Sequence, residues 1–518
     1  MKKSIFKYYP FLPLLLLCAL YICKAIAFPI HDFANYYFGG YFLREHTFTS
    51  NTYFPYLFNK EIVALGNAPL FAGFAPNTPF LAMLLYPFTF ISLASAKLIF
   101  NIISSILFII SIYRLAQFYK VNWAYLLLIP IVFFVPIKNE LLFGQVYLLL
   151  FFFLAEFWLA HEKNQQFKSA MFLSLAIFLK VFPVLLILIY LFKKQFKPLF
   201  YILGIGVLFF GISLLFIDIN LWQFYINDVL FKSSNGEIAS SFVDNYQSVF
   251  MFLKRLFVYD AVENMHPFFH ASGYFPGAIL AFKIGFVSLG YFVTRYSKNN
   301  LQIISFWILA LILLSPYGST YTFILMLFPF LALLKSEIPN VKKILFCGML
   351  LLINNLPLAL FMEKEFPISY LRLFFLIAFF IFFVISIFKK SRLVKAILIG
   401  CLVFGIGTFF KHEKPQNSKS FLVKEVPLLI YNYKIENNQL TYFYWNQNGE
   451  NKTSIPFKCS SVTELEIKKN QIVKSFRILT FDNSHKYKPM LIDNRAVLYL
   501  SDYDRGIGFY TLRKIELH

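Results

Sequence analysis

The chain has 518 residues, of which 59% are hydrophobic, 20% are aromatic and only 14% are charged. This composition excludes a soluble multidomain protein and is typical of a polytopic membrane protein. The formal net charge of +22 would also suit a nucleic-acid-binding protein, but the Lys and Arg residues fall mostly in short runs between apolar segments, as they do in cytoplasmic loops. We therefore predict that the chain lies in membrane lipid and has no nucleic-acid partner.

The first apolar segment, residues 9–29, begins after a basic N-terminus and has no clean small-residue cleavage site. We expect it to be retained as a first span that runs outward from the cytoplasm. Residues 30–92 follow as a polar, aromatic outer loop with short helices. Within this loop, residues 79–91 are apolar but too short to cross comfortably, so they are predicted to form an interfacial or re-entrant helix.

The later apolar segments are predicted to alternate across the membrane, because each loop assigned to the inside is basic. Lys138-Asn139-Glu140 is predicted to be a short outer turn. Residues 169–192 are predicted to form two short helices that meet near Lys180 and Pro183, since one continuous helix would leave Lys180 at mid-bilayer. Residues 218–274 form a second large outer loop. The other predicted spans are residues 94–118, 123–136, 146–160, 198–217, 275–294, 301–314, 321–334, 344–361, 368–387 and 394–410.

Residues 1–411 are thus predicted to form an all-α polytopic membrane domain with about 13 transmembrane helices. After Lys411 the composition changes: residues 412–518 alternate apolar and polar positions, are rich in β-forming residues, and have turn signals at Asn448-Gly449 and Asp504-Arg505-Gly506. We predict a small β-rich extracytoplasmic domain there. Its expected strands include residues 428–433, 440–445, 496–500 and 507–512.

Cysteine usage gives no sign of metal or redox chemistry. Four of the five cysteines lie in apolar segments, at Cys18, Cys23, Cys347 and Cys401. Because no spacing fits a metal site, the sequence predicts no disulfide framework, no bound metal and no other cofactor.

Asp32 is the strongest candidate for a catalytic residue. It lies just past the outer end of the first span, where an acidic side chain is expensive to place and is functional by default. Neighbouring aromatic residues, among them Tyr36, can stack on a sugar ring while the carboxylate takes a proton from a hydroxyl group. The alternative is that Asp32 only caps a short helix that begins at Phe33.

Other polar residues are predicted to gather at the same membrane face. Each residue also has an explanation that involves no substrate. Gln145 can be an ordinary polar residue at a helix end, Lys180 can extend its ammonium to the membrane interface, and Arg255 can lie on a solvated helix. Together they supply cations for a lipid phosphate and amide or hydroxyl groups for a sugar. The candidate binding residues are Tyr36, Gln145, Lys180, Asn245, Gln247, Arg255, Ser315 and Tyr321.

These features follow one another in a definite order. They are Asp32 with Tyr36 after the first span, a Pro-rich region over residues 76–87, Gly144-Gln145, the Lys180–Pro183 hairpin, Asn245-x-Gln247-Ser248 with Arg255, and Ser315-Pro316. Over residues 5–335 this order resembles glycosyltransferase family 87, the polyprenyl-phosphate-mannose-dependent mannosyltransferases of the membrane GT-C superfamily. The β-rich region has no counterpart in the resemblance.

The resemblance implies inverting transfer of a hexose, mannose in that family, from a polyprenyl-phosphate sugar to a glycan or glycolipid acceptor. It implies that Asp32 is the general base, and we assign Lys180 and Arg255 to the phosphate. One departure concerns the residues after Ser315-Pro316: the family commonly has a Trp and one or two His there, whereas this chain has Ser319, Tyr321 and Thr322. Tyr321 can donate a hydrogen bond, but it is not a cation near neutral pH.

The alternative function is a transporter or flippase for a lipid-linked sugar. Transporters often contain repeated halves and broken helices that meet at mid-membrane, whereas here no internal repeat is evident and the polar clusters collect at one face. The richness in Lys, Asn, Ile and Phe indicates a bacterial chain. We therefore expect a multi-pass protein of the inner (plasma) membrane, with a cytoplasmic N-terminus and a periplasmic or extracellular C-terminal domain.

Overall fold

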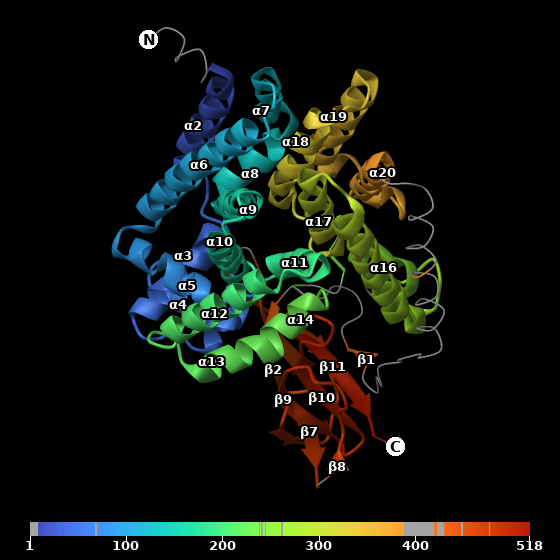
Figure 1. Cartoon of the computed structure of the whole chain (residues 1–518). Coiled ribbons are helices and arrows are strands. Elements are labelled where there is room, and N and C mark those ends of the chain that lie inside the picture. The colour runs from blue at the N-terminus through green and yellow to red at the C-terminus, as the bar shows by residue number, and fades with distance from the viewer. Residues whose placement is uncertain are drawn as a thin grey trace.

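The computed structural model describes residues 9–67, 70–237, 239, 242–243, 245–260, 263–387, 399, 419–421, 429–446, 449–475 and 477–517. The predicted span over residues 394–410 lies outside these ranges, as do Asp244 and Asn448. Helices dominate the chain up to residue 387, and strands dominate the part after residue 419. Figure 1 shows the strands gathered at one end of the molecule, away from the N-terminus.

The helical part consists of long apolar helices interrupted by short ones. Long apolar runs adopt helix because lipid offers no partner for backbone N–H and C=O groups. The α-helices are α2 (Leu12–Ala27), α3 (Phe33–Arg44), α4 (Pro55–Ala64), α5 (Pro79–Leu85), α6 (Leu93–Phe118), α7 (Ile129–Val132), α8 (Phe134–Phe143), α9 (Tyr147–Glu162), α10 (Gln166–Leu179), α11 (Ile187–Lys193), α12 (Phe196–Ser213), α13 (Ile219–Phe224), α14 (Phe231–Ser234), α15 (Val249–Phe257), α16 (Phe275–Tyr296), α17 (Asn300–Leu314), α18 (Leu327–Lys335), α19 (Asn340–Asn355) and α20 (Leu371–Ile387).

Within the described residues, five helices are long and apolar enough to cross a membrane. They are Tyr9–Ala27, Leu93–Phe118, Phe196–Ser213, Ser272–Tyr296 and Ile368–Ser386. A sixth span results if Trp123–Val132 and Phe134–Phe143, which meet at an angle of 61°, cross as one broken helix. These helices make the chain a membrane protein with several spans, and the expected total of about 13 stays a prediction.

The two short-helix regions predicted from the sequence are confirmed. Residues 79–91 form α5 and a 3₁₀ turn, Tyr86–Phe90. Residues 169–192 break where expected: α10 ends at Leu179, Lys180 is extended, and a 3₁₀ turn at Phe182–Leu186 leads into α11.

The prediction of an outer turn at Lys138-Asn139-Glu140 is wrong. These residues belong to α8, which continues to Phe143 and ends at Gly144 in a left-handed conformation with φ of 70°. The helix tolerates Glu140 because the buried carboxylate accepts a hydrogen bond from the Leu148 amide at 2.9 Å. It therefore satisfies one of the free N–H groups at the start of α9.

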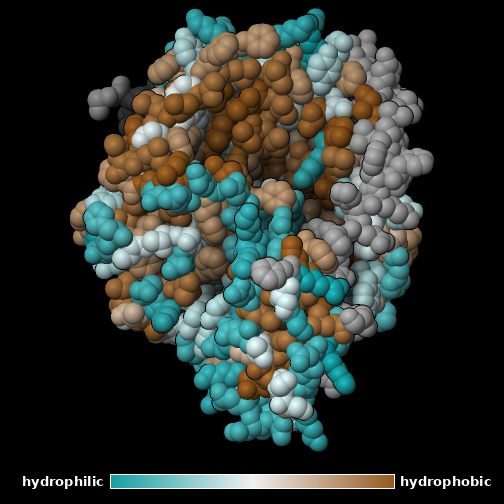
Figure 2. Space-filling model, turned by 90° about the horizontal axis from the view of Figure 1, so that it is seen from below, coloured by the Kyte–Doolittle hydropathy of each residue, from teal (hydrophilic) through white to brown (hydrophobic). Residues whose placement is uncertain are grey.

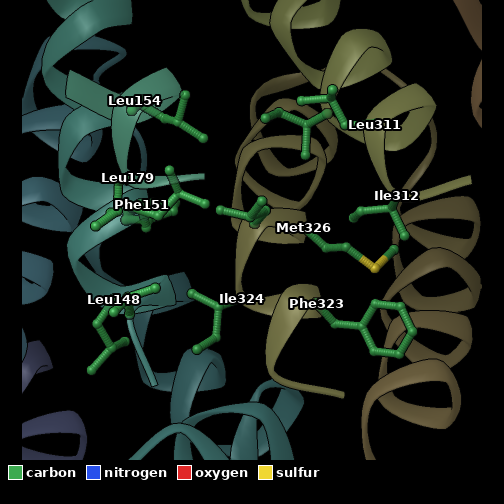
Figure 3. Packing of buried hydrophobic residues seen from close by; sticks show 14 of the residues in the cluster. Leu148, Phe151, Leu154, Leu179, Leu311, Ile312, Phe323, Ile324 and Met326 are labelled. Carbon is green, nitrogen blue, oxygen red and sulfur yellow. The ribbon is translucent and has the colours of Figure 1, made fainter. Parts of the chain in front are cut away.

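The core of the helical part is formed by aliphatic and aromatic side chains of α9, α10, α17 and the 3₁₀ segment Thr320–Met326 (η8). In Figure 3, Leu148, Phe151 and Leu154 of α9 face Ile324 and Met326 of η8, and Leu311 and Ile312 of α17 lie on the far side. All the residues labelled in Figure 3 are at most 5% exposed. This packing fixes the ends of the helices that carry the candidate site.

The surface of the helical part is strongly apolar. Figure 2 shows a hollow in one face that is lined by hydrophobic side chains, with hydrophilic side chains along part of its border. An exposed apolar surface of this extent suits contact with lipid.

The C-terminal region forms antiparallel sheets. The strands are β1 (Lys419–Ser420), β2 (Leu429–Glu436), β3 (Gln439–Asn446), β4 (Gly449–Pro456), β5 (Val462–Glu464), β6 (Glu466–Lys468), β7 (Gln471–Lys474), β8 (Arg477–Ile478), β9 (Lys486–Ile492), β10 (Ala496–Ser501) and β11 (Thr511–Glu516). The described strands make a five-stranded sheet in the order β1-β11-β10-β9-β5 and two three-stranded sheets, β2-β3-β4 and β6-β7-β8. Every residue of β10 is buried, as expected for a central strand.

Local turn chemistry sets the register of these strands. Glu436 pairs with Gln439, and Asn437 and Asn438 between them have φ of 52° and 57°, as a two-residue hairpin requires. The predicted strand over residues 507–512 is wrong in its first part, because β11 begins only at Thr511. Gly508 has φ of 72°, and its amide donates to the Asp502 carboxylate at 3.0 Å, which keeps residues before Thr511 in a turn.

The β-rich region contacts the segment between α12 and α16 through buried charges. The Lys232 ammonium lies 3.0 Å from the Asp502 carboxylate and 3.1 Å from that of Glu237, and it also donates to the Asp502 and Arg505 carbonyls at 3.0 Å. Lys254 pairs with Asp504 at 3.0 Å. Figure 1 shows α13 and α14 directly beside these strands.

Candidate functional site

Asp32 does not cap the helix that follows it. It is the residue before α3, but its backbone is helical, with φ of −55° and ψ of −25°, and its side chain makes no capping hydrogen bond. The interpretation of Asp32 as a helix cap is therefore wrong. Instead, its carboxylate accepts a hydrogen bond from the Gln145 side-chain amide at 2.5 Å.

Gln145 joins Asp32 to Tyr36. The Gln145 amide oxygen accepts a hydrogen bond from the Tyr36 hydroxyl, and the amide nitrogen donates to Asp32. The amide is therefore held in one orientation, with its N–H toward the carboxylate. Tyr36 is 1% exposed and Gln145 is 5% exposed, so this chain of hydrogen bonds is shielded from water.

Gly144 places Gln145 against α3. The turn needs a positive φ, and a Cβ on Gly144 would lie 2.7 Å from the Cβ of Phe33. Glycine satisfies both conditions because it tolerates the left-handed region and has no side chain. The junction between α8 and α9 thereby brings the Gln145 side chain to the start of α3.

Lys180 lies at the break between α10 and the next turn. Its ammonium donates to the Asn77 side-chain oxygen at 2.8 Å and lies over the rings of Tyr36 at 5.6 Å and Tyr147 at 5.9 Å. These contacts hold the Lys180 ammonium next to Tyr36, close enough for its charge to act on the Asp32 carboxyl.

The pKa of the Asp32 carboxyl is raised above its ordinary value of 3.8, chiefly because burial disfavours the charged form. The Gln145 hydrogen bond acts in the opposite direction, as do the charges of His31 and Lys180. A carboxylate with a raised pKa is a stronger proton acceptor than an exposed one, which suits a general base.

Asp32 lines a cavity of about 580 Å³. Two of the predicted binding residues, Asn245 and Tyr321, line the same cavity. The full lining consists of His31, Asp32, Val135, Lys138, Asn139, Phe143, Asn245, Tyr246, Ser319, Thr320, Tyr321, Asn355, Leu356, Pro357, Leu358 and Arg372. A volume of this size accommodates one sugar ring and the groups next to it.

Six predicted binding residues lie outside this lining, as far as the structure describes the chain. Tyr36, Gln145 and Lys180 are the residues described above around Asp32, and the other three lie elsewhere. Gln247 donates from its side-chain amide to the Ser369 carbonyl at 2.9 Å. The Ser315 hydroxyl accepts from the Tyr317 amide at 3.1 Å. Arg255 donates to the Glu263 carbonyl at 3.3 Å and lies 5.4 Å from the ring of Phe242. These contacts are all made within the protein.

The sequence reasoning missed three polar residues of the site. Lys138 and Glu140 were assigned to a turn. In the structure Lys138 lines the cavity, and Glu140 is buried, with 1% of its surface exposed. Arg372, in the first turn of α20, also lines the cavity. The available signal for Arg372 was its position at the predicted outer end of a span, where the orientation rule does not favour a basic residue.

Among the described residues, no group of three or more His, Cys, Asp or Glu side chains could hold a metal ion. Chemistry without a metal or another cofactor stays a prediction from the sequence.

Comparison with known proteins identifies the class of the site. Residues 74–316 match the sequence model of Glycosyltransferase family 87. The matched range contains Gln145, Lys180 and the loop with Asn245, whereas Asp32 and Tyr36 precede it and Tyr321 follows it. A search of curated proteins gave no match. The matched range covers just under half of the chain and includes most features of the resemblance, though not Asp32 and Tyr36. Over this range the chain is similar to glycosyltransferase family 87, and the match supports an enzyme, a membrane glycosyltransferase.

Proposed function

We propose that this enzyme transfers a hexose, mannose by family resemblance, from a polyprenyl-phosphate sugar to a glycan or glycolipid acceptor. The reaction takes place at the outer face of a bacterial plasma membrane, on a GT-C-type arrangement of about 13 helices. The observation that carries the proposal is the Asp32 carboxylate, which lines a cavity and is held by Gln145 at 2.5 Å. The alternative of a transporter or flippase loses its support because the matched family consists of glycosyltransferases.

The proposed mechanism is a single displacement. The acceptor hydroxyl gives its proton to Asp32, and its oxygen attacks the anomeric carbon of the donor sugar. The bond from this carbon to the phosphate oxygen breaks, and the electron pair leaves with the prenyl phosphate. One bond forms as another breaks on the opposite side of the ring, so the configuration at the anomeric carbon inverts.

The other residues around Asp32 have positioning roles in this mechanism. Gln145 fixes the direction of the carboxylate, and Tyr36 fixes Gln145. Lys180 lowers the cost of keeping Asp32 charged in a buried place. Asn245 and Tyr321 line the cavity and supply an amide and a hydroxyl group for the sugar.

The test is transfer by purified enzyme from a panel of prenyl-phosphate sugars, with products identified by mass spectrometry. The Asp32→Asn variant should lose about 10²–10⁴-fold in turnover, because the amide cannot take the proton, and should still bind the donor. Glu61→Gln is the matched control, since Glu61 is an exposed carboxylate on α4. Unchanged transfer by Asp32→Asn would refute Asp32 as the base.

A further inference from the structure

The cavity that contains Asp32 also contains two cations that no carboxylate of the described residues neutralises. Lys138 of α8 and Arg372 of α20 line it. Among the described lining residues, Asp32 is the single acidic one, and its hydrogen bond comes from Gln145. The lining therefore carries a surplus of positive charge, which an anionic ligand would balance.

Arg372 has unused hydrogen-bonding capacity. It is 2% exposed, and one terminal nitrogen, Nη2, donates to the Leu356 carbonyl. Its Nε and Nη1 atoms have no hydrogen-bond partner in the part of the chain that the structure describes. Leaving donors of a buried cation unpaired is costly, and the guanidinium presents its donors as a fork that fits phosphate oxygens.

Lys138 adds a second positive charge from a different helix. Its side chain is half-buried, and its ammonium has no hydrogen-bond or ion-pair partner among the described residues. A lysine at this place acts as a point charge, which complements the directional donors of an arginine.

We propose that Arg372 and Lys138 form a phosphate-binding site in the same cavity as the general base. The two cations alone support binding of a phosphate group at this site. The further statement that the phosphate is part of a prenyl phosphate rests on the proposed function. In the transfer step, cleavage of the bond to the anomeric carbon leaves an additional negative charge on the phosphate. Arg372 and Lys138 stabilise that charge within the cavity. This assignment replaces Arg255, whose guanidinium donates to the Glu263 carbonyl instead.

Binding of farnesyl phosphate to the full-length enzyme in lipid nanodiscs tests the proposal. Arg372→Gln and Lys138→Gln should each weaken this binding about 10-fold to 100-fold, the usual loss for a hydrogen bond to a charged group. Binding of farnesol should be weak and the same in all variants. The matched control is Lys60→Gln, because Lys60 is an exposed cation on α4. Competition by inorganic phosphate at equal concentration would assign the site to free phosphate and not to a lipid.

Unchanged affinity in the Arg372→Gln, Lys138→Gln double variant would overturn the proposal, as would equal binding of farnesol and farnesyl phosphate. Lys138→Gln keeps the test decisive if Arg372→Gln fails to fold, because Lys138 is only half-buried. The outcome is separate from that for Asp32. Loss of phosphate binding in Arg372→Gln together with unchanged transfer by Asp32→Asn would refute the proposed base and leave the phosphate site standing.

Discussion

At the scale of single residues, the contact between Asp32 and Gln145 is the centre of the site. The two residues are 113 positions apart in the chain, so neither local pattern nor spacing could predict that they meet. The sequence did indicate both residues as candidates, because each is a polar residue at the end of an apolar segment. The structure speaks against the helix-cap interpretation, since the Asp32 side chain bonds to Gln145 and makes no capping hydrogen bond, and the role of Asp32 as a base stays a proposal.

The raised pKa of Asp32 predicts the pH dependence of transfer. Burial favours the protonated acid, and a general base must be deprotonated, so the rate should fall as pH decreases through a pKa that lies above 3.8. The Gln145 hydrogen bond lowers this pKa. Gln145→Leu should therefore move the acidic limb of kcat/KM to higher pH. A limb that stays in place or moves to lower pH would contradict the assignment of Asp32 as the titrating base.

Arg372 shows what sequence reasoning could not reach at this scale. A single Arg in the first turn of an apolar helix carries no motif. Its two donor atoms without a partner among the described residues become visible only when α8, α20 and the cavity are placed together. Arg255 shows the converse: the Lys254-Arg255 pair is conspicuous in the sequence, but in the structure Lys254 contacts Asp504 and Arg255 contacts Glu263.

At the scale of elements, the junction between α8 and α9 determines where the site residues point. Three consecutive polar residues, Lys138 to Glu140, read as a loop from the sequence, whereas α8 continues through them because Glu140 supplies a partner to the α9 amides. The junctions at residues 79–91 and 169–192 were predictable, since a segment too short to span, or one with a lysine at its centre, must break.

Replacement of Gly144 tests this junction. Gly144→Ala would force a Cβ into the left-handed region and to within 2.7 Å of the Phe33 Cβ. We expect destabilisation of about 1–3 kcal/mol and a loss of turnover as Gln145 moves from Asp32. Thermal unfolding in detergent and the transfer assay measure the two effects. Gly204→Ala on α12 is the control, because its Cβ would meet nothing within 4 Å. Equal behaviour of the two variants would show that the junction does not position Gln145.

At the scale of the whole molecule, the β-rich region is connected to the cavity through the segment between α12 and α16. Lys232 bonds to Asp502 and Glu237, Lys254 pairs with Asp504, and Tyr56 of α4 stacks on Tyr431 of β2 at 3.8 Å. The sequence predicted a β-rich region and much of β2, β3 and β10 from alternation and turn residues. Docking could not be predicted, because it depends on charges brought together from positions far apart in the chain.

Removal of the buried cation should loosen this docking. Lys232→Met leaves Asp502 and Glu237 buried without their partner, and we expect a loss of about 3–5 kcal/mol in stability. Because the loop that bears Asn245 lies between Lys232 and Lys254, the KM for the acceptor should rise more than kcat falls. Lys468→Met is the control, since Lys468 and Glu466 form an exposed pair, with side chains 65% and 73% exposed. Unchanged thermal unfolding of Lys232→Met would show that these charges do not hold the β-rich region in place.

The hydrogen bond from Gln247 to Ser369 has a consequence for how substrates enter and leave. Gln247 comes two residues after Asn245, and Ser369 lies in the 3₁₀ turn just before α20, three residues before Arg372. One amide therefore connects the loop proposed to contact the sugar with the start of the helix proposed to contact the phosphate. With this hydrogen bond in place, neither the Asn245 loop nor the start of α20 can move away from the cavity without moving the other. Under the proposed function we therefore expect departure of the prenyl phosphate from Arg372 to promote release of the glycosylated product, so that the two products leave together.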